Sequence, residues 1–594
     1  MSEPFVFDPR CELCKTPFGA AVCGQEILFT CRPLANEGFT HCALVLHREF
    51  SGQSQEVELS PAGFWGDRMC FTTVFQAPEE PELIWYHFRF WRDNGSGCDL
   101  DKTGYRSDGQ PLSWQLTVYR RSHTPDWYGG GMVYQIFPDR FRRLSVPDPA
   151  GLVGNRWVHQ NWEDAPTWRP DPDGEVRNRD FFGGSLAGIT EKLDELAALG
   201  VTALYMCPIF ESASNHRYNT ADYTKIDPLL GNEEDFKTLC AKAKERGIRV
   251  ILDGVFNHTG SQSIYFNADG FYPSLGAAQS QDSPYSDWFS FHPWPDDYDA
   301  WWGIRTLPAV REDAASYVDY IIDGEDSIIR RWLRSGASGW RLDVADELPD
   351  WFIEKARKAV EETKEDGLLI GEVWEDASNK IAYSQRRKYL LGSELHGVMN
   401  YPFRTALLTY LKGGNAEGFR DSMETIRENY PPESKEERAN FRLSPDQRQR
   451  GVDLLRLAAL ALFSFPGVPT VFYGDEAGME GWEDPFNRGT YPWGQEDTAI
   501  RDYFALLGGL RKQRASLRQG GLRWLCAEGR LAAFARESAG ERSVAVLNAG
   551  DEPRTLTLDW PWENCTDLLS GRNFAPVDGE LHLALSPYEG LLLG

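Results

Sequence analysis

The spacing of apolar residues divides the chain into three regions. Short apolar runs broken by glycine, proline and asparagine turns predict an all-β domain over residues 1–122. From residue 123, short apolar runs alternate with stretches in which apolar residues recur at helical spacing, as over 185–199. This alternation predicts strands and helices in turn. Short β runs return over 520–594 and predict a second β domain.

The alternating region predicts a parallel β/α barrel over 123–258 and 314–519. Seven strands are recognisable in it: 132–136, 202–208, 248–256, 339–344, 368–373, 397–400 and 470–476. Between the two parts, residues 259–313 lose all regular spacing and are rich in glycine, serine, proline and aromatic residues. A loop of this length inside a compact domain predicts a small inserted domain after the third strand.

An eight-stranded barrel needs one more strand, the seventh in chain order, between the strands at Val398 and Val471. The sequence offers no candidate for it. Residues 404–430 read as helical, and a charged, proline-containing stretch follows. Ser444 and Pro445 then suit the N-cap and first position of the next helix, which makes Asp446 a first-turn acid. An eight-stranded barrel closes only when strand number and shear agree. The sequence therefore predicts a wall that is open here or filled by a neighbouring segment.

Two carboxylates end two consecutive predicted strands, Asp343 in 339–344 and Glu372 in 368–373. The ends of parallel strands converge on one mouth of a barrel, so both acids can face a common substrate. Such pairs serve glycoside hydrolysis, although isolated acids are more often an ordinary surface pair. Arg341 lies on the same side of its strand as Asp343, and we expect it to hold that carboxylate ionised.

Composition narrows the class of protein. The net charge of −27 over 594 residues argues against nucleic acid, which requires a basic face. No apolar run is long enough to span a membrane, and no apolar leader opens the sequence. The odd count of 11 cysteines fits free thiols and a cytoplasmic protein. Cys11 and Cys14 could begin a zinc site with Cys23 and Cys31, but those two lack the second close pair, so no metal site is predicted.

Four segments, in order, carry a family resemblance. They are 253–258 (DGVFNH), 306–310 (TLPAV), 339–347 (GWRLDVADE) and 371–374 (GEVW). They resemble glycoside hydrolase family 13, the α-amylase family, and within it the neopullulanase, cyclomaltodextrinase and maltogenic amylase branch. The resemblance implies an α/β fold, a (β/α)8 TIM barrel with an N-terminal β-sandwich, an inserted loop domain and a C-terminal β-sandwich. It also implies a retaining hydrolase of α-1,4 bonds in maltooligosaccharides, cyclodextrins or pullulan, with α-1,6 bonds left open.

The resemblance assigns roles to particular residues. Asp343 is implied to be the nucleophile and Glu372 the acid/base, and partial desolvation beside Trp374 would keep Glu372 protonated. The other residues implied to contact substrate are Arg341, His258, Asn257, Asp253, Tyr218 as a stacking platform, His216, Trp374 and Glu347. Four loop tryptophans, Trp288, Trp294, Trp301 and Trp302, suit either the core of the insertion or substrate contacts.

The sequence departs from the family at one motif. The fourth signature, a His-Asp pair after the seventh strand, is missing, since no His-Asp dipeptide occurs in the chain. That pair supplies the family's third carboxylate. Three functions therefore stay open: a hydrolase, a transglycosylase on the same substrates, and a catalytically impaired glucan-binding homologue.

The resemblance also bears on cofactors and partners. No cofactor is required, and structural calcium is an alternative in a region that holds Asp148, Asn155, Asp180 and Gly184. The expected partner is an α-glucan. The N-terminal domain implies a homodimer in which one subunit covers the other's active-site mouth.

Overall fold

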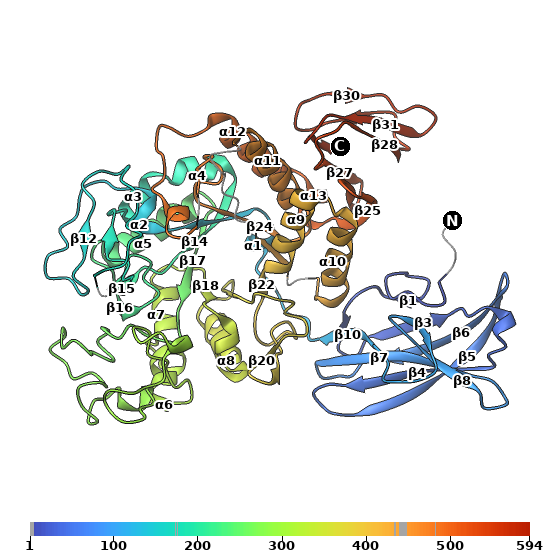
Figure 1. Ribbon diagram of the computed structural model, residues 1–594, viewed down its shortest axis with the longest axis horizontal. Coiled ribbons are helices and arrows are strands. Elements are labelled where there is room, and N and C mark those ends of the chain that lie inside the picture. Colours follow the sequence, from blue (N-terminus) through green and yellow to red (C-terminus); the bar gives the residue numbers. More distant parts are fainter. Residues whose placement is uncertain (1–4, 173, 175, 433–434, 439–447, 482) are drawn as a thin grey trace. The chain divides into compact units, whose positions relative to one another are not determined.

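The computed structural model describes residues 5–172, 174, 176–432, 435–438, 448–481 and 483–594 (Figure 1). The chain forms two compact units. The first holds residues 1–123 together with 376–397 and 421–435, and the second holds 124–375, 398–420 and 436–594. No described helix combines the length and apolar character that a membrane span requires.

The N-terminal region of the first unit is a β domain. Its described strands pair in the order β1-β3-β6-β5-β4-β7-β10-β2, with β8 and β9 extending from β7. Alternation along β3 buries Ile27, Phe29 and Cys31 in one apolar core and leaves the residues between them more exposed. The strand bounds are β1 Lys15–Thr16, β2 Ala21–Val22, β3 Glu26–Cys31, β4 His41–Arg48, β5 Ser54–Trp65, β6 Arg68–Gln76, β7 Glu82–Trp91, β8 Gly97–Asp101, β9 Gly104–Arg106 and β10 Trp114–Tyr119.

The second unit is built on a closed barrel, as the TIM-barrel prediction requires. Among the described residues, eight strands follow one another around it. The pairs β11–β14, β14–β17, β17–β18, β18–β19, β23–β24 and β11–β24 are parallel. Their bounds, in barrel order, are β11 Met132–Ile136, β14 Val201–Met206, β17 Arg249–Gly254, β18 Gly339–Leu342, β19 Leu368–Gly371, β22 Gly397–Asn400, β23 Lys435–Arg438 and β24 Val468–Phe472.

Helices connect most of these strands. Helix α5 is typical: Asn232 caps it by accepting the backbone N–H groups of Glu234 and Asp235, and Phe236, Leu239 and Ala243 bury one face. The predicted helix over 185–199 is instead two short helices that meet at Lys192. The bounds are α3 Leu186–Glu191, α4 Leu193–Leu199, α5 Glu233–Glu245, α7 Ile328–Arg334, α8 Asp350–Thr363, α9 Tyr401–Gly413, α10 Ala416–Asn429, α11 Arg448–Ser464 and α12 Thr498–Gln513.

Strand β23 corrects the sequence prediction. The expectation that 404–469 contains no strand is wrong, because Lys435–Arg438 runs parallel to β24, with Glu436 opposite Val468 and Arg438 opposite Thr470. A Lys-Glu-Glu-Arg segment has neither apolar alternation nor β-branched residues, so its sequence gives no strand signal. Main-chain pairing defines it instead. The predicted helix start at Ser444 to Asp446 lies outside the described residues.

The C-terminal region is again β. A sheet of order β25-β26-β27-β32 and a pair β28–β31 enclose an apolar core that includes Leu531, Val546 and Trp560. The bounds are β25 Gly521–Glu528, β26 Leu531–Ser538, β27 Glu541–Asn548, β28 Arg554–Asp559, β29 Cys565–Thr566, β30 Asn573–Phe574, β31 Glu580–Leu585 and β32 Gly590–Leu593.

Candidate active site

Three adjacent barrel strands bring the predicted acids together. Asp253 lies in β17 opposite Arg341 of β18, and Leu342 of β18 lies opposite Gly371 of β19. Asp343 and Glu372 directly follow those last two residues. The register therefore places three carboxylates and one guanidinium at one end of the barrel.

The Arg341 guanidinium binds all three carboxylates. Its Nη1 lies 2.7 Å from Asp253 Oδ1 and 2.8 Å from Asp343 Oδ1, and its Nη2 lies 2.8 Å from Glu372 Oε2. The Arg341 side chain is 3% exposed, so solvent screens these charges little. The predicted bond from Arg341 to Asp343 is confirmed, and the same guanidinium links the proposed nucleophile to the proposed acid/base.

Sharing one positive charge changes the ionisation expected for Asp343. The pKa of Asp343 is raised to about 7, chiefly by burial, against the lowering effect of Arg341 and with smaller contributions from Asp253 and Glu372. The pKa of Asp253 is raised as well, chiefly by burial. Arg341 lowers the pKa of Asp343 in the expected direction, but the net pKa stays raised, so Asp343 is only partly ionised near neutral pH. One guanidinium cannot compensate three buried carboxylates.

Tyrosines hold two of the carboxylates. The Tyr205 and Tyr218 hydroxyls donate to Asp253 Oδ2 at 2.6 and 3.0 Å, and the Asp253 side chain is fully buried. Tyr401, the first residue of α9, donates its hydroxyl to Glu372 Oε1 at 2.9 Å. Tyr401 was not predicted from the sequence, although its position directly after the sixth strand is a signal of the kind that marked Asp343.

The backbone beside Glu372 is strained. Val344 has φ 37°, in the left-handed region that β-branched residues avoid, and its N–H donates to Glu372 Oε2 at 3.2 Å. Strain of this kind persists where the surrounding structure over-determines a conformation, often at active sites. The turn after β18 thus helps to fix Glu372.

Asn257 and the two histidines line the same region as neutral groups. Asn257 Nδ2 donates to the Asp343 carbonyl at 3.2 Å, and His258 contacts the Asn257 side chain through Nδ1 and the Tyr218 carbonyl through Nε2, at 3.0 Å. The Tyr218 N–H donates to His216 Nδ1 at 3.1 Å. Burial lowers the pKa of His258 to about 4 and that of His216 to about 3. Neither histidine carries a charge at neutral pH.

The inserted segment adds aromatic rings next to these groups. Trp301 lies 5.3 Å from His258 between ring centroids and stacks on Trp302 at 4.9 Å. Trp302 is 63% exposed, packs edge-on against Trp374 at 5.7 Å, and donates Nε1–H to Glu347 Oε1 at 3.2 Å. Trp302, Trp374 and Glu347 thus form an exposed cluster, which we call the aromatic rim.

The other two loop tryptophans are built into the insertion. Trp288 is buried and bonds through Nε1 to Ser316 Oγ at 3.0 Å. Trp294 donates its Nε1–H to the Ala277 carbonyl at 2.9 Å. The two alternatives for the loop tryptophans therefore divide between the pairs: Trp288 and Trp294 serve the insertion, and Trp301 and Trp302 adjoin the site.

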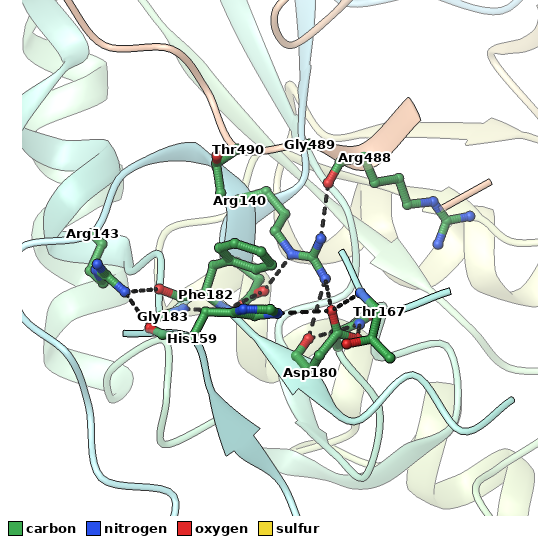
Figure 2. Close-up of polar contacts among 12 residues, drawn as sticks. Arg140, Arg143, His159, Thr167, Asp180, Phe182, Gly183, Arg488, Gly489 and Thr490 are labelled. Atoms are coloured by element: carbon green, nitrogen blue, oxygen red, sulfur yellow. Dashed lines mark hydrogen bonds and ion pairs between the residues drawn. The ribbon is translucent and has the colours of Figure 1, made fainter. Parts of the chain in front are cut away.

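The region considered for calcium holds a charge-neutralised cluster (Figure 2). Asp180 Oδ2 lies 3.4 Å from His159 Nε2 and 3.6 Å from Arg140 Nη2, and it accepts the Thr167 N–H at 3.0 Å. Although burial raises the pKa of Asp180, bonds to His159 and the charge of Arg140 lower it overall. An aspartate facing a guanidinium and an imidazole does not fit a calcium site. No group of three or more potential metal ligands was found among the described residues.

Comparison with known families agrees with this geometry. Residues 135–506, most of the chain and all eight barrel strands but the start of the first, match the alpha amylase catalytic domain. The chain belongs to the α-amylase family. Residues 524–592 also match the C-terminal domain of maltogenic amylase, which places this family member in the branch that its motifs indicate.

Individual relatives of this α-amylase family member span different lengths. Neopullulanase 2 of Thermoactinomyces vulgaris is 30% identical over 93% of both chains. An amylopullulanase of Thermoanaerobacter thermohydrosulfuricus is 34% identical over 90% of this chain but only 41% of its own length, so the chain spans less than half of that relative. The type III pullulan hydrolase from Thermococcus kodakarensis has a similar structure, with 25% identity, a TM-score of 0.67 and 99% of both chains covered.

Proposed function

We propose that the protein is a retaining α-glucan hydrolase that cleaves α-1,4 bonds, and potentially α-1,6 bonds, in maltooligosaccharides, cyclodextrins or pullulan. The observation that carries the proposal is the single Arg341 guanidinium bound to both Asp343 and Glu372. Two carboxyl groups held this close suit the retaining arrangement, in which the second acts directly on the sugar.

The two acids divide the reaction between them. Asp343 attacks the anomeric carbon to form a glycosyl-enzyme bond, while Glu372 donates its proton to the departing glycosidic oxygen. Glu372 then removes a proton from water, which releases the sugar and restores both groups. Three carboxylates share one guanidinium, and the pKa values of Asp343 and Asp253 are raised. The first step requires Asp343 to be ionised while Glu372 carries the proton.

A transglycosylase is the second candidate, and the aromatic rim is the observation that favours it. Trp374 lies two residues after Glu372, and Trp302 packs against it with most of its surface exposed. Exposed indole faces bind the apolar faces of sugar rings, so the rim can hold an acceptor sugar where water would otherwise attack. The ratio of transfer products to hydrolysis products formed from maltotriose measures whether a sugar or water attacks the glycosyl-enzyme bond more often.

The third candidate is an impaired, glucan-binding homologue. The chain has no His-Asp pair, and Asp253, the third carboxylate on Arg341, has its side chain fully buried and bonded to two tyrosines. Loss of one preorganised transition-state group lowers the rate by about 10²–10³. We therefore expect hydrolysis at least about 100-fold slower than in complete relatives.

One experiment separates the candidates. The chain is assayed for product release from maltotriose, β-cyclodextrin and pullulan, and calorimetry measures binding of the same sugars. Slow turnover that Glu372→Gln abolishes supports the hydrolase. Binding without any turnover supports the glucan-binding protein instead, and no binding and no turnover contradicts both.

We further propose a cytoplasmic homodimer. All 11 cysteines are free thiols, as expected in a reducing compartment. The N-terminal domain exposes two consecutive aromatic residues, Phe64 and Trp65, at the end of β5, with 70% and 51% of their surfaces exposed. Adjacent exposed aromatic residues are typical of interface cores.

A further inference from the structure

A second pocket lies between the barrel helices and the C-terminal sheet, and it shares no residue with the active site. It has a volume of about 570 Å³, within the range of roughly 300–1,000 Å³ typical of small-molecule sites. Helices α11 and α12 supply Arg456 and Tyr503, and the turns next to β29 and β32 supply Arg572 and Tyr588. We call it the junction pocket.

Arg456 supplies unused hydrogen-bond donors to the junction pocket. Among the described residues its guanidinium makes neither a hydrogen bond nor an ion pair, and its Nε is buried. The guanidinium carbon lies over the Tyr503 ring, 5.7 Å from the ring centroid. The Tyr503 hydroxyl donates to the Arg456 carbonyl at 3.2 Å and makes no bond to the guanidinium. The two terminal nitrogens of Arg456, unlike its Nε, are reached from the pocket, so an acceptor from outside the chain can bind their N–H groups there.

Tyr588 presents its ring from a strained turn. Its φ is 54°, in the left-handed region that bulky residues rarely adopt, and its N–H is held by the Gly550 carbonyl at 2.9 Å. The next residue, Glu589, accepts the Ser586 N–H at 2.7 Å and pairs with Arg572 at 3.1 Å. The turn is therefore fixed on both sides of the tyrosine. Strained backbone held in this way is common at binding sites.

The charges of the junction pocket indicate the class of ligand. Asp453, Asp567 and Glu589 outnumber Arg456 and Arg572, so an anion would meet net repulsion. The carboxylate of Asp567 has no acceptor capacity left for a ligand, since it accepts hydrogen bonds from the N–H groups of Leu569, Ser570 and Leu592. The groups left for a ligand are the Arg456 guanidinium as donor, Asp453 Oδ2 as acceptor and the two tyrosine rings as stacking faces; Asp453 Oδ1 accepts from Gln449 Nε2 at 3.0 Å. A neutral polyhydroxylated ligand satisfies all three.

We propose that the junction pocket is a second binding site for α-glucan chains, separate from the active site. The choice of α-glucan among neutral polyols rests on the proposed function. Such a site would hold a long chain on the protein between cleavage events by raising its effective concentration.

The test uses the full chain with Glu372→Gln, so that no sugar is consumed, and maltotriose as the probe in calorimetry. We expect binding at the junction pocket in addition to any at the active site. Adding Arg456→Ala should weaken that component at least about tenfold. The matched control is Arg554→Ala, another arginine of the C-terminal region, whose side chain is exposed and, within the described part of the chain, pairs only with Glu552, at 3.9 Å.

A second variant guards against misfolding. Glycine adopts a left-handed φ without strain, so Tyr588→Gly should unfold at or above the parent temperature while losing the same binding component. The proposal is overturned if maltotriose binding is unchanged by both variants. It is also overturned if inorganic phosphate, rather than maltotriose, binds in an Arg456-dependent way. Hydrolysis is measured separately with the chain that keeps Glu372. If that chain is inactive but maltotriose still binds in an Arg456-dependent way, only the proposed hydrolase function is refuted.

Discussion

Arg341 sets the charge of the active site, since its one guanidinium serves three buried carboxylates. Had only Asp343 faced it, ion pairing would have lowered the pKa of that acid. Burial and the two other carboxylates outweigh the arginine instead. Both the activity and the stability of the protein should therefore depend on pH near neutrality.

The activity prediction follows from the nucleophile, which must be ionised to attack. Because the pKa of Asp343 is raised to about 7, kcat/KM on maltotriose should fall as the pH drops below about 7, well above the range of an ordinary aspartate. The His258→Gln variant should show the same fall in kcat/KM at low pH, since the pKa of His258 is lowered to about 4. If the fall disappears in this variant, the titrating group is the histidine.

The stability of the protein should also depend on the ionisation of Asp343. A carboxyl group with a raised folded-state pKa stabilises the protein below its unfolded value of 3.8, and this contribution is lost as the pH rises through about 7. Asp343→Asn should therefore raise the melting temperature, and by more at pH 8 than at pH 5. The control is Asp326→Asn, at a side chain that is 95% exposed. An equal gain at both pH values would contradict the assignment.

At the scale of single elements, the turn over 301–303 supplies Trp302 to the aromatic rim. Trp302 has φ 50°, so its backbone is strained while its ring is largely exposed. Trp302→Gly should leave the melting temperature unchanged or higher, yet raise KM for β-cyclodextrin about tenfold by removing one sugar-stacking face. Trp351→Ala, at an exposed tryptophan of α8, serves as the control and should alter neither KM nor product ratios.

Strand β23 is the element whose sequence least resembles its structure. Glu437 lies opposite Pro469 of β24 in the barrel wall. Proline at 437 removes a backbone donor, so Glu437→Pro should lower the denaturant midpoint, whereas Glu437→Val, with higher β-propensity, should keep or raise it. Equal midpoints in both variants would show that Lys435–Arg438 does not contribute to the wall.

At the scale of the whole molecule, the first compact unit is assembled from three stretches of chain. Gln115 Nε2 donates to Ser378 Oγ at 3.0 Å, the Arg120 N–H to the Leu391 carbonyl at 2.9 Å, and Arg10 Nη2 to Thr425 Oγ1 at 2.9 Å. Deleting residues 1–122 would leave such partners unpaired. A surface substitution is therefore the better test of dimerisation.

If the exposed end of β5 forms the dimer interface, Phe64→Asp should yield monomers, because a charge buried without a partner opposes association. Leu112→Asp, at a residue of the same domain that is 58% exposed, should leave the dimer intact. Sedimentation of the parent and both variants measures the mass. A parent chain that sediments as a monomer would refute the dimer, and a dimer in all three would move the interface elsewhere.

The sequence by itself determined the features that depend on local pattern. Apolar spacing located seven of the barrel strands, because buried parallel strands need apolar residues on both faces. The position of Asp343 and Glu372 at strand ends was enough to bring them together, since the barrel sends all such ends to one mouth. The motifs around them identified the family for the same local reason.

The tertiary structure decided what depends on distant partners. Lys435–Arg438 became a strand through main-chain pairing with β24, which its charged side chains do not signal. The raised pKa of Asp343 arises from burial and from carboxylates on two other strands. Tyr401, Trp302 and the junction pocket likewise join segments far apart in the chain. Residue patterns record burial and backbone preference along one segment, whereas charge, strain and cavities are set by the segments that meet there.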